Sequence, residues 1–335
     1  MTLRPLLLAC LVAAVSLVGC GPQRTTELDP RFDMQAMNRK VTAIVEEAAP
    51  ARVTVAFMDL GNAEVWSHYG DTPMPMQSVF KAPLAAAVLS EVDAGRLSLE
   101  EVVTIGEEDL SPQLSAISRA WPAVRSYTVR ELLVRAVRDS DNTAADVLMK
   151  RIGGPGAVTA WLDAQRIRGI RIDRYEREIQ MEIAGLASFR PAWKDAAPIA
   201  AVPEPQRRAA LEAFLADPRD TATAHGMIDF LSRLAAGELL SKPSSQLLMQ
   251  ILGESRTGPR RIAAGLPEGA SLAHKTGTAR PDLGMSPVVN DVGIATLPNG
   301  RRYAIAVLMS GCRAQLADCE AVLAQVTRAL IDEAG

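Results

Sequence analysis

The sequence places its β-type segments near its two ends and its helical segments between them. Four short β-type segments pair around turn signals and predict two hairpins: 52–60 with 63–69 around Gly61-Asn62, and 291–297 with 302–310 around Pro298-Asn299-Gly300. Residues from 78 to about 253 are rich in Ala, Leu and Val and carry helical punctuation. Because strands and helices segregate instead of alternating, we predict an α/β protein of α+β layout. Its mainly antiparallel sheet is formed by both chain ends and flanked by helices, beside an all-helical lobe.

The terminal helices of this layout follow from apolar spacing. Residues 32–48 place apolar side chains at helical intervals, and residues 317–334 do the same at the other end. The chain is long enough for one large domain. We therefore expect a single two-lobed catalytic domain over 32–335, with a sheet lobe made of about 32–69 and 268–335 and a helical lobe of about 70–267.

The first twenty residues predict the compartment. Arg4 precedes an apolar run over 6–17, and Leu17-Val18-Gly19-Cys20 follows, which is typical of a lipoprotein signal peptide. The run is too short to span a membrane, so we expect cleavage before Cys20 and a lipid on that cysteine. Residues 21–31, which are polar and contain two prolines, would form a tether. An ordinary signal peptide with an incidental cysteine is the alternative. Either way we expect a periplasmic protein, and the first interpretation anchors it to the membrane.

Several classes of function are disfavoured by composition. The formal net charge is −3 and no basic stripe is present, so we expect no nucleic-acid partner. His68, His225 and His274 lack metal-binding spacings, so we predict no metal site and no cofactor. We also expect a monomer.

Cys312 and Cys319 leave two alternatives open. They form either a disulfide or two free thiols.

Three short motifs predict a serine acyl-transfer site. They are Ser78-Val79-Phe80-Lys81, Ser140-Asp141-Asn142 and Lys275-Thr276-Gly277, in that order. Each has an ordinary explanation alone: a helix cap with a surface lysine, a helix start, and an edge strand protected by a lysine. The three together form a known signature of serine enzymes that open β-lactams or bind penicillin.

The first two motifs would supply the nucleophile and the proton carriers. Ser78 and Lys81 lie three residues apart on the first turn of a predicted helix, so the amine can contact the hydroxyl and act as its base. The backbone N–H of Ser78 would donate to the developing oxyanion. Ser140 lies in a loop, where it can relay a proton to the leaving nitrogen, and the Asn142 amide can bind a substrate carbonyl.

The third motif predicts an exposed sheet strand along which substrate lies. Lys275 would supply positive charge, Thr276 would contact substrate, and the Thr278 N–H would be the second oxyanion donor. Gly277 would leave room for the ligand.

In these three motifs and in the stretches between them, the chain resembles a class A β-lactamase over nearly all of its mature length. Weaker stretches support the resemblance: Thr128–Leu132, Gly153–Pro155, Asp173–Glu176, Pro218–Thr221, Ala235–Leu240 and His274–Thr278. The resemblance implies a hydrolase of β-lactam antibiotics that confers resistance through a serine acyl-enzyme.

The same resemblance assigns the residues that release the product. Glu176 would be the general base that drives water onto the acyl-enzyme, and Arg174 with Asp220 would close the neck of the loop that carries it. The alternative for Glu176 is a solvated surface charge. Arg177 replaces the family's usual proline, and Gln180 replaces its usual asparagine, so we expect slower deacylation. Whether Lys81 or Glu176 is the base for acylation stays open.

Two further features belong to the resemblance. Arg261 matches a position from which some class A enzymes bind the substrate carboxylate, with Thr257 as a weaker hydroxyl contact. The segment 181–218 is roughly thirty residues longer than expected and includes a predicted helix over 206–216. It either folds over the cleft or packs away from it.

Two other functions remain open on these motifs. One is a D-Ala-D-Ala peptidase or related serine hydrolase that uses the same serine and lysine. The other is a penicillin-binding or sensing lipoprotein that is acylated once and does not turn over.

Overall fold

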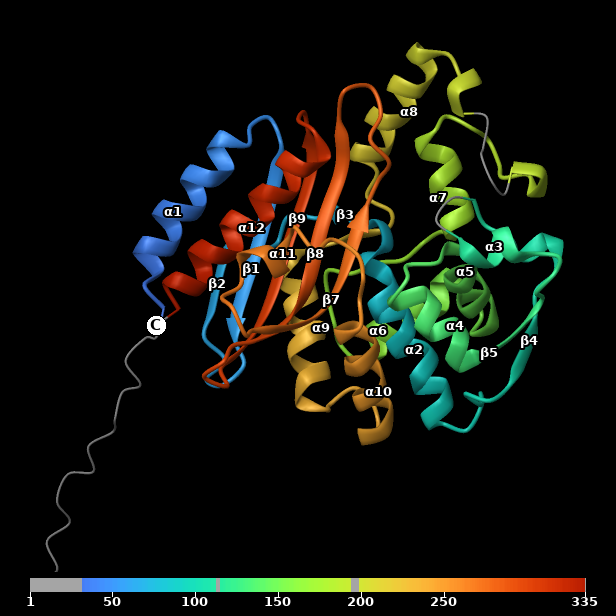
Figure 1. Ribbon diagram of the computed structural model, residues 1–335, viewed down its shortest axis with the longest axis horizontal. Helices are drawn as coiled ribbons and strands as arrows, with labels where there is room; N and C mark the ends of the chain where they lie inside the picture. Colours follow the sequence, from blue (N-terminus) through green and yellow to red (C-terminus); the bar gives the residue numbers. More distant parts are fainter. Residues whose placement is uncertain (1–31, 113–114, 194–198, 335) are drawn as a thin grey trace, which may run out of the picture.

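The computed structural model describes residues 32–112, 115–193 and 199–334, and Figure 1 shows a sheet on one side and a group of helices on the other. The main sheet has the order β2-β1-β9-β8-β7, and every neighbouring pair is antiparallel. Its strands are β1 (Arg52–Asp59), β2 (Val65–His68), β7 (Ser271–Thr278), β8 (Ser286–Thr296) and β9 (Arg302–Cys312). Both predicted hairpins are confirmed, and a central sheet built from both chain ends follows from them. The predicted signal peptide, Cys20 and the tether lie outside the described residues.

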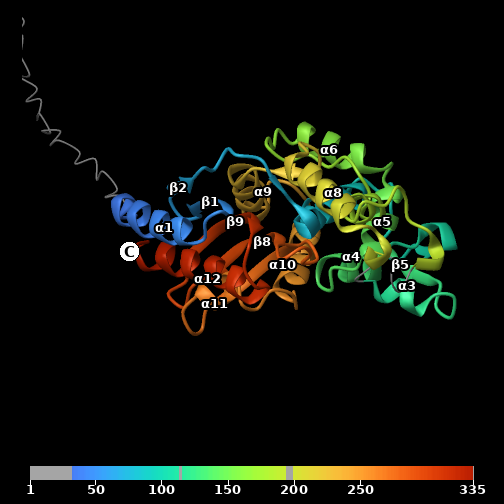
Figure 2. The same ribbon diagram turned by 90° about the horizontal axis from the view of Figure 1, so that it is seen from above.

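Helices cover both faces of this sheet, as the view from above in Figure 2 shows. On one face lie α1 (Met34–Glu47), α11 (Ile262–Gly265) and α12 (Leu316–Asp332), and on the other lies α9 (Ala224–Ala236). The buried strand side chains on one face pack with Met37, Val41, Leu323 and Val326 of the terminal helices. The position of α9 corrects the proposed lobe boundary, because this helix falls within 70–267 yet covers the sheet.

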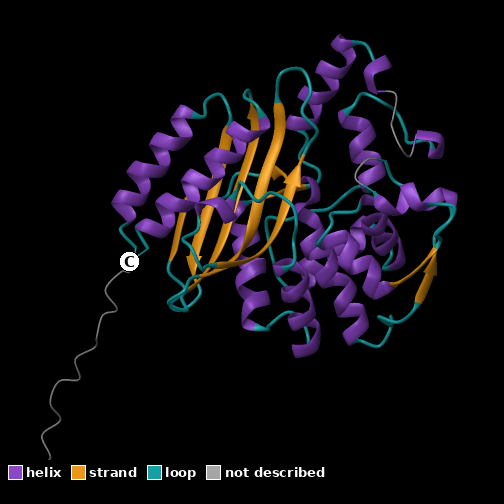
Figure 3. Ribbon diagram, viewed as in Figure 1, coloured by secondary structure: helices purple, strands orange, loops and turns teal. Residues whose placement is uncertain are grey.

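The second lobe is mainly but not entirely helical (Figure 3). Its helices are α2 (Lys81–Asp93), α3 (Ala116–Ala120), α4 (Val129–Val137), α5 (Asn142–Arg151), α6 (Pro155–Ala164), α7 (Glu176–Ile183), α8 (Glu204–Ala216) and α10 (Lys242–Gly253). Two short strand pairs also lie outside the main sheet: β3 (Met74–Pro75) with β6 (Thr221–Ala222), and β4 (Val102–Thr104) with β5 (Ser126–Thr128). The expectation of an all-helical lobe was wrong here, since strands of two or three residues leave no periodic pattern in a sequence.

Helix α2 lies at the centre of the second lobe. Residues 81–89 are all buried, and the run from Ala85 to Ala87 keeps the helix thin enough for α4, α5, α6 and α10 to pack around it. The buried cluster that contains α2 also includes Val292, Ala306 and Leu308 of the sheet. One core therefore continues across the two lobes, and it holds the start of α2 against the sheet.

The long segment after α7 contains structure of its own. Short turns at Pro191–Trp193 and Ile199–Ala201 lead into α8, which extends the helix predicted over 206–216 by two residues. Leu211 and Phe214 of α8 form a small separate core with Ile179, Ala279 and Val288. The inserted segment therefore packs beside α7 and the end of β7, and it does not lie away from the region of the motifs.

The remaining sequence alternative concerns the cysteines. Cys312 at the end of β9 and Cys319 in α12 form a disulfide. This bond links the last strand to the helix that covers the sheet.

Candidate active site

The predicted nucleophile and its lysine meet at the junction of two helical turns. Ser78 lies in a 3₁₀ turn (η1, Gln77–Phe80), and Lys81 is the first residue of α2, so the two do not share one α-helix as predicted. Their contact is nevertheless present, because Lys81 Nζ donates to Ser78 Oγ over 2.9 Å. The Lys81 side chain is fully buried.

Acceptors surround the Lys81 amine. Besides Ser78, Nζ donates to the Ser140 carbonyl at 2.9 Å and to Asn142 Oδ1 at 2.6 Å, and it lies 2.9 Å from Glu176 Oε1. An ammonium has three protons to donate and no lone pair, so this shell of acceptors suits the protonated form. In this arrangement Lys81 acts as a positive charge beside the serine.

Ser140 joins the two lysines of the site. It lies between α4 and α5 with φ of 59°, in the left-handed region that a non-glycine residue rarely adopts. Its carbonyl accepts from Lys81, while its Oγ accepts from Lys275 Nζ over 3.0 Å. The ordinary explanation for this motif holds as well, because Asp141 caps α5 by accepting from the Ala144 N–H.

The Asn142 amide is engaged at both ends. Its Oδ1 accepts from Lys81 and its Nδ2 donates to the carbonyl of Pro112 at 3.2 Å. Its predicted contact with a substrate carbonyl stays a prediction, while its contact with Lys81 is direct.

The third motif is an edge strand, but it is not exposed. Lys275 is fully buried, and Thr276 is nearly so. Burial, and then the nearby Lys81 charge, lower the pKa of Lys275 well below its ordinary value. Thr276 Oγ1 lies 2.6 Å from Thr257 Oγ1, so both hydroxyls predicted as contacts belong to one hydrogen-bonded pair.

The register of β7 on β8 directs the Thr278 N–H away from the sheet. Ala279 N donates to Val288 O at 3.1 Å, so Ala279 and Val288 occupy a hydrogen-bonded position of the pair. In an antiparallel pair, hydrogen-bonded and non-bonded positions alternate, and Thr278 opposite Val289 is therefore non-bonded. Its N–H points to the free edge of β7, which contacts the turn that contains Ser78. This is the geometry that the predicted second oxyanion donor needs.

Gly277 has a different role from the predicted one. A Cβ at this position would lie 2.2 Å from the Met76 carbonyl oxygen and 3.2 Å from Val79 N. The glycine therefore allows the backbone of β7 to approach the turn that carries Ser78, and the space that it leaves is filled by protein. The two proposed oxyanion donors depend on this approach.

Glu176 lies directly at the nucleophile. It is the first residue of α7, is fully buried, and its Oε1 accepts from Ser78 Oγ over 3.0 Å. Burial would raise the pKa of its carboxyl, but the Lys81 charge and hydrogen bonds from Gln180, Lys81 and Ser78 outweigh burial and lower the pKa. The alternative of a solvated charge is thus excluded, and the group is a carboxylate at neutral pH.

The loop neck has the expected ion pair. Arg174 Nε lies 2.6 Å from Asp220 Oδ2, and both side chains are almost fully buried. Asp220 Oδ1 also accepts from the backbone N–H groups of Asp173 and Arg174. These contacts therefore hold together the two ends of the segment that carries Glu176.

Gln180 contacts the Glu176 carboxylate, and Gln77 in turn contacts Gln180. Gln180 Nε2 donates to Glu176 Oε2 at 2.9 Å and to Gln77 Oε1 at 3.0 Å. Both protons of the Gln180 amide nitrogen are then in use, which leaves Gln180 Oε1 as an acceptor for water. Gln77 was not identified from the sequence. In the sequence, its place next to the nucleophile was the one signal that could have indicated a role. In the structure, its φ of 47° lies in the left-handed region, which a non-glycine residue rarely adopts.

Asp146 is a further residue that the sequence analysis missed. It is buried, and it accepts from the backbone N–H of Glu176 at 2.7 Å and of Arg177 at 3.1 Å. Burial, with the nearby Glu176 charge, raises the pKa of Asp146 to about 6, and the hydroxyl of Ser111 also donates to it. A carboxylate here holds the first turn of α7, whose N-terminal N–H groups have no partner within the helix. The spacing Asn142-x-x-x-Asp146 on one helix face was the signal.

Arg261 lies beside the end of β7, and its guanidinium donates to four groups of the protein. These are Glu320, the carbonyls of Gly277 and Asn290, and Thr278 Oγ1 at 2.7 Å. Its direct contact with a substrate carboxylate stays a prediction. The structure shows instead that it holds Thr278, the residue with the proposed oxyanion N–H.

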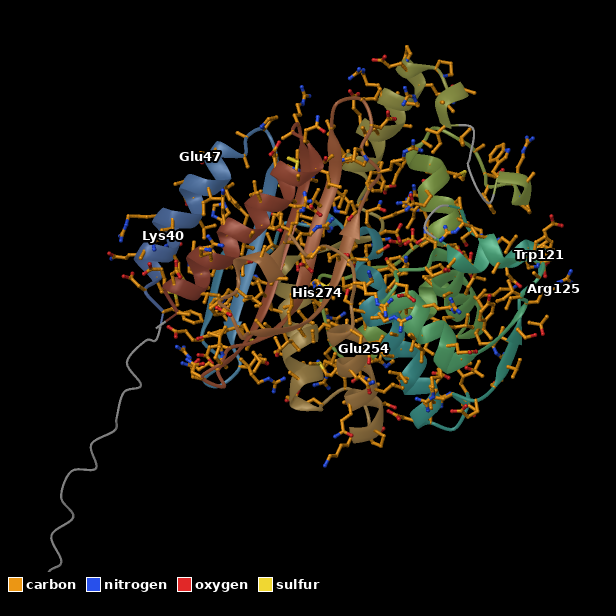
Figure 4. The ribbon with its side chains drawn as sticks, in the orientation of Figure 1. Lys40, Glu47, Trp121, Arg125, Glu254 and His274 are labelled. Atoms are coloured by element: carbon orange, nitrogen blue, oxygen red, sulfur yellow. A yellow bond between two sulfur atoms is a disulfide. The ribbon has the colours of Figure 1, made fainter. Side chains whose placement is uncertain are left out.

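Metal ligands do not cluster around this site. Across 32–112, 115–193 and 199–334, no group of three or more His, Cys, Asp or Glu side chains is placed to hold a metal ion. His274, labelled in Figure 4 within the sheet, is bound to Asp291 through Nδ1 at 2.8 Å. The site is a buried cluster of two serines, two lysines and a carboxylate.

Comparisons with known proteins identify the family of the chain. The β-lactamase enzyme family matches residues 36–334. The chain is 33% identical to β-lactamase VEB-1 of Pseudomonas aeruginosa over 267 residues, which cover 79% of this chain and 80% of that protein. The crystal structure of a β-lactamase from Chitinophaga pinensis superposes with a TM-score of 0.74 at 31% identity, over 89% of this chain and 99% of that one. The reconstructed class A β-lactamase of the last common ancestor of Gram-negative bacteria gives a TM-score of 0.72 at 32% identity, over 89% and 98%. Fold, site and comparisons together show that the chain belongs to the class A β-lactamase family.

Proposed function

We propose that the protein hydrolyses the β-lactam ring through an acyl-enzyme on Ser78, with Glu176 as the general base for both steps. One observation carries the proposal: Ser78 Oγ lies 2.9 Å from Lys81 Nζ and 3.0 Å from Glu176 Oε1. The hydroxyl accepts from a cation and donates to a carboxylate, so its proton is directed at a base while its lone pair stays available.

In the acylation step, Ser78 Oγ forms a bond to the ring carbonyl carbon and its proton passes to Glu176. The carbonyl oxygen gains negative charge, which the N–H groups of Ser78 and Thr278 stabilise. The C–N bond then breaks, and the ring nitrogen takes a proton from the Ser140 hydroxyl. Lys275, which donates to that hydroxyl, replaces it. The proton that Glu176 accepted passes by way of Lys81 and Ser140 and replaces the one that Lys275 gave up. Over the whole step Ser78 loses one proton and the ring nitrogen gains one, while Glu176 and Lys275 return to their starting states.

In the deacylation step, water replaces the serine as the nucleophile. Once Ser78 is esterified, its Oγ has no proton to donate, and Glu176 accepts from a water that Gln180 Oε1 also holds. Glu176 takes the proton of the water as a C–O bond forms at the ester carbon. The Ser78 ester bond then breaks, and Glu176 returns the proton to Ser78 Oγ, which restores both groups. This step distinguishes a β-lactamase from the two alternatives, because a peptidase or a sensor can remain acylated after it reacts with penicillin.

Turnover of nitrocefin by protein lacking residues 1–20 tests the proposal. We expect sustained hydrolysis by the wild type and none by Ser78→Ala. A single stoichiometric burst would favour the sensing lipoprotein, and activity restricted to D-Ala-D-Ala peptides would favour the peptidase. Either result would overturn the proposed hydrolysis.

The proposed location rests on the sequence alone. Within the described ranges, no helix has the length and apolar character to cross a membrane. We infer that the protein faces the periplasm as a monomer on a lipid at Cys20. Fractionation of cells that express the full chain tests this, because Cys20→Ala should move the protein from the membrane to the soluble fraction.

A further inference from the structure

Four buried hydroxyl side chains lie together next to the catalytic residues, and the mechanism above does not use them. They are Ser111, Ser115, Ser118 and Thr143, which we call the hydroxyl cluster, and at most 2% of any of them is exposed. Thr143 Oγ1 accepts from the Ser111 N–H at 3.0 Å and from Ser115 Oγ at 2.8 Å. It also lies 2.8 Å from Ser118 Oγ. A buried hydroxyl is costly without a partner, and each of these four has one.

Ser111 is the member that connects the hydroxyl cluster to the active site. Its N–H donates to Thr143 Oγ1, its carbonyl accepts from Ser118 Oγ at 3.0 Å, and its own Oγ donates to Asp146 Oδ2. Thr143 and Asp146 are three residues apart on α5 and therefore lie on one side of that helix. Because the first two contacts hold the backbone of Ser111, its hydroxyl is directed at Asp146.

The contact with Asp146 leads to the general base. Asp146 Oδ1 accepts from the Glu176 N–H and Oδ2 from the Arg177 N–H, so the carboxylate uses both oxygens to hold the start of α7. Burial raises the pKa of Asp146, the hydrogen bond from Ser111 opposes this change, and the Glu176 charge adds to it. Ser111 therefore favours the ionised form, in which neither oxygen carries a proton and both can accept.

The backbone next to Ser111 leads to the lysine. The carbonyl of Pro112 accepts from Asn142 Nδ2 at 3.2 Å, and Asn142 Oδ1 accepts from Lys81 Nζ at 2.6 Å. A proline has no N–H with which to anchor itself, so the place of this carbonyl depends on how Ser111 is held. The pair Ser111-Pro112 is thus connected to both groups that contact the nucleophile, which are the Lys81 amine and the Glu176 carboxylate.

We propose that Ser111 is a positioning residue for the reaction. Its hydroxyl acts through Asp146 on the place of Glu176, and its backbone sets the neighbouring carbonyl that holds Asn142. Ser111 is fully buried and does not touch substrate, so its effect falls on the rate of the chemical steps and not on binding. The proposal rests on the proposed hydrolysis, in which Glu176 is the base.

Ser111→Ala tests the proposal. We expect kcat for nitrocefin to fall by about tenfold, the equivalent of one hydrogen bond, while KM stays within about twofold. Ser111→Cys keeps the shape of the side chain and donates only weakly, so its kcat should lie between those of the wild type and Ser111→Ala. A kcat unchanged in Ser111→Ala would overturn the proposal.

Ser244→Ala is the matched control for a loss of stability. Ser244 is also buried, and its Oγ donates to Asp93 Oδ1 at 2.6 Å, at the opposite end of α2 from Lys81. This variant loses an equivalent hydrogen bond, so its Tm should fall as in Ser111→Ala while its kcat stays within about twofold. Equal losses of kcat in the two variants would show a general effect of stability and would overturn the proposal.

A double-mutant cycle shows whether Ser111 acts through Asp146. Asp146→Asn replaces one carboxylate oxygen by an NH2 group, which donates and does not accept. In that background Ser111→Ala should change kcat by less than about twofold, because the acceptor of its hydroxyl is already lost. Losses that multiply fully in the double variant would contradict a path through Asp146 and would overturn the proposal.

Failure of the proposed function gives a different result. The wild type would then be acylated by nitrocefin without sustained turnover. The acylation rate of Ser78, measured by mass spectrometry, carries the same comparison in that case, because the Glu176 carboxylate accepts from Ser78 before acylation. A slower acylation in Ser111→Ala than in Ser244→Ala would support the role of Ser111, and equal rates would overturn it.

Discussion

The catalytic cluster and the inserted segment are built in opposite ways. The cluster is buried and bound from many elements: η1, the α4–α5 loop, α5, α7 and β7 each supply a contact to Ser78 or Lys81, or to a group that touches them. The insertion is held by a small core around Leu211 and by the Arg207–Asp282 pair. This contrast indicates that the catalytic geometry depends on the whole fold, while the insertion is held by a few local contacts and can change with less effect on that geometry.

Glu176→Gln should have the largest effect, because it removes a base from the cluster without changing its shape. We expect kcat to fall by about 10³-fold, within the range of general-base catalysis. If some acylation continues through Lys81, the acyl-enzyme will accumulate and be visible by mass spectrometry. Normal turnover by this variant would show that the carboxylate is not the deacylating base.

Gly277→Ala tests whether catalysis requires the close approach of β7 to the turn that carries Ser78. The new Cβ would press on the Met76 carbonyl and move the Thr278 N–H away from Ser78, so we expect kcat/KM for nitrocefin to fall by about 10²-fold, as for loss of one oxyanion donor. Gly253→Ala is the matched control, since its Cβ would meet nothing within 4 Å. Equal activity of the two variants would show that catalysis does not depend on the absence of a side chain at position 277.

Gln77→Leu removes the acceptor that orients Gln180 and leaves the catalytic groups in place. We expect deacylation to slow by about tenfold, the equivalent of one hydrogen bond, with acylation changed less. Pre-steady-state kinetics separate the two rates. An equal loss in both steps would point to a general disturbance of the turn that carries Ser78.

The pH profile tests the burial of Lys275. Because its pKa is lowered, the positive charge that holds Ser140 is lost at a pH below the ordinary lysine value, and kcat/KM should fall there. Lys275→Arg should move this basic limb to higher pH, since an arginine does not titrate in that range. Over the same window the unfolded chain binds more protons than the folded one, so the free energy of unfolding should rise with pH. Activity and stability changing in the same direction would contradict the assignment.

Leu211→Ala should have the smallest effect on the reaction, which completes the comparison. It removes a buried side chain from the core of the insertion, and limited proteolysis should then cut the insertion faster. The value of kcat/KM for nitrocefin should stay within about twofold, because no catalytic group rests on α8. A loss of activity comparable to that of Gly277→Ala would show that the insertion also supports the chemistry.

Much of the catalytic site could be predicted because its residues lie in short motifs. Ser78 and Lys81 are three residues apart, and Asp141 caps the helix that follows Ser140, so local sequence fixes part of their geometry. The exposure of the Lys275 strand was predicted wrongly, since an edge strand is identified by its sequence pattern and not by what packs on its edge. Gln77 and Asp146 were missed because their partners Gln180 and Glu176 lie 103 and 30 residues away along the chain.

The sequence by itself determined the two-lobed layout, the antiparallel hairpins and the order of the catalytic motifs, because hydrophobic period, turn residues and short spacings are local properties. Only the tertiary structure decided that Glu176 contacts Ser78 directly, that Gly277 serves a backbone contact, and that the insertion encloses a cavity beside Gln180. Each of these three features depends on the distance in space between two segments that are far apart in the sequence. That distance is set by the packing of a core shared by both lobes, and it leaves no signature in either segment alone.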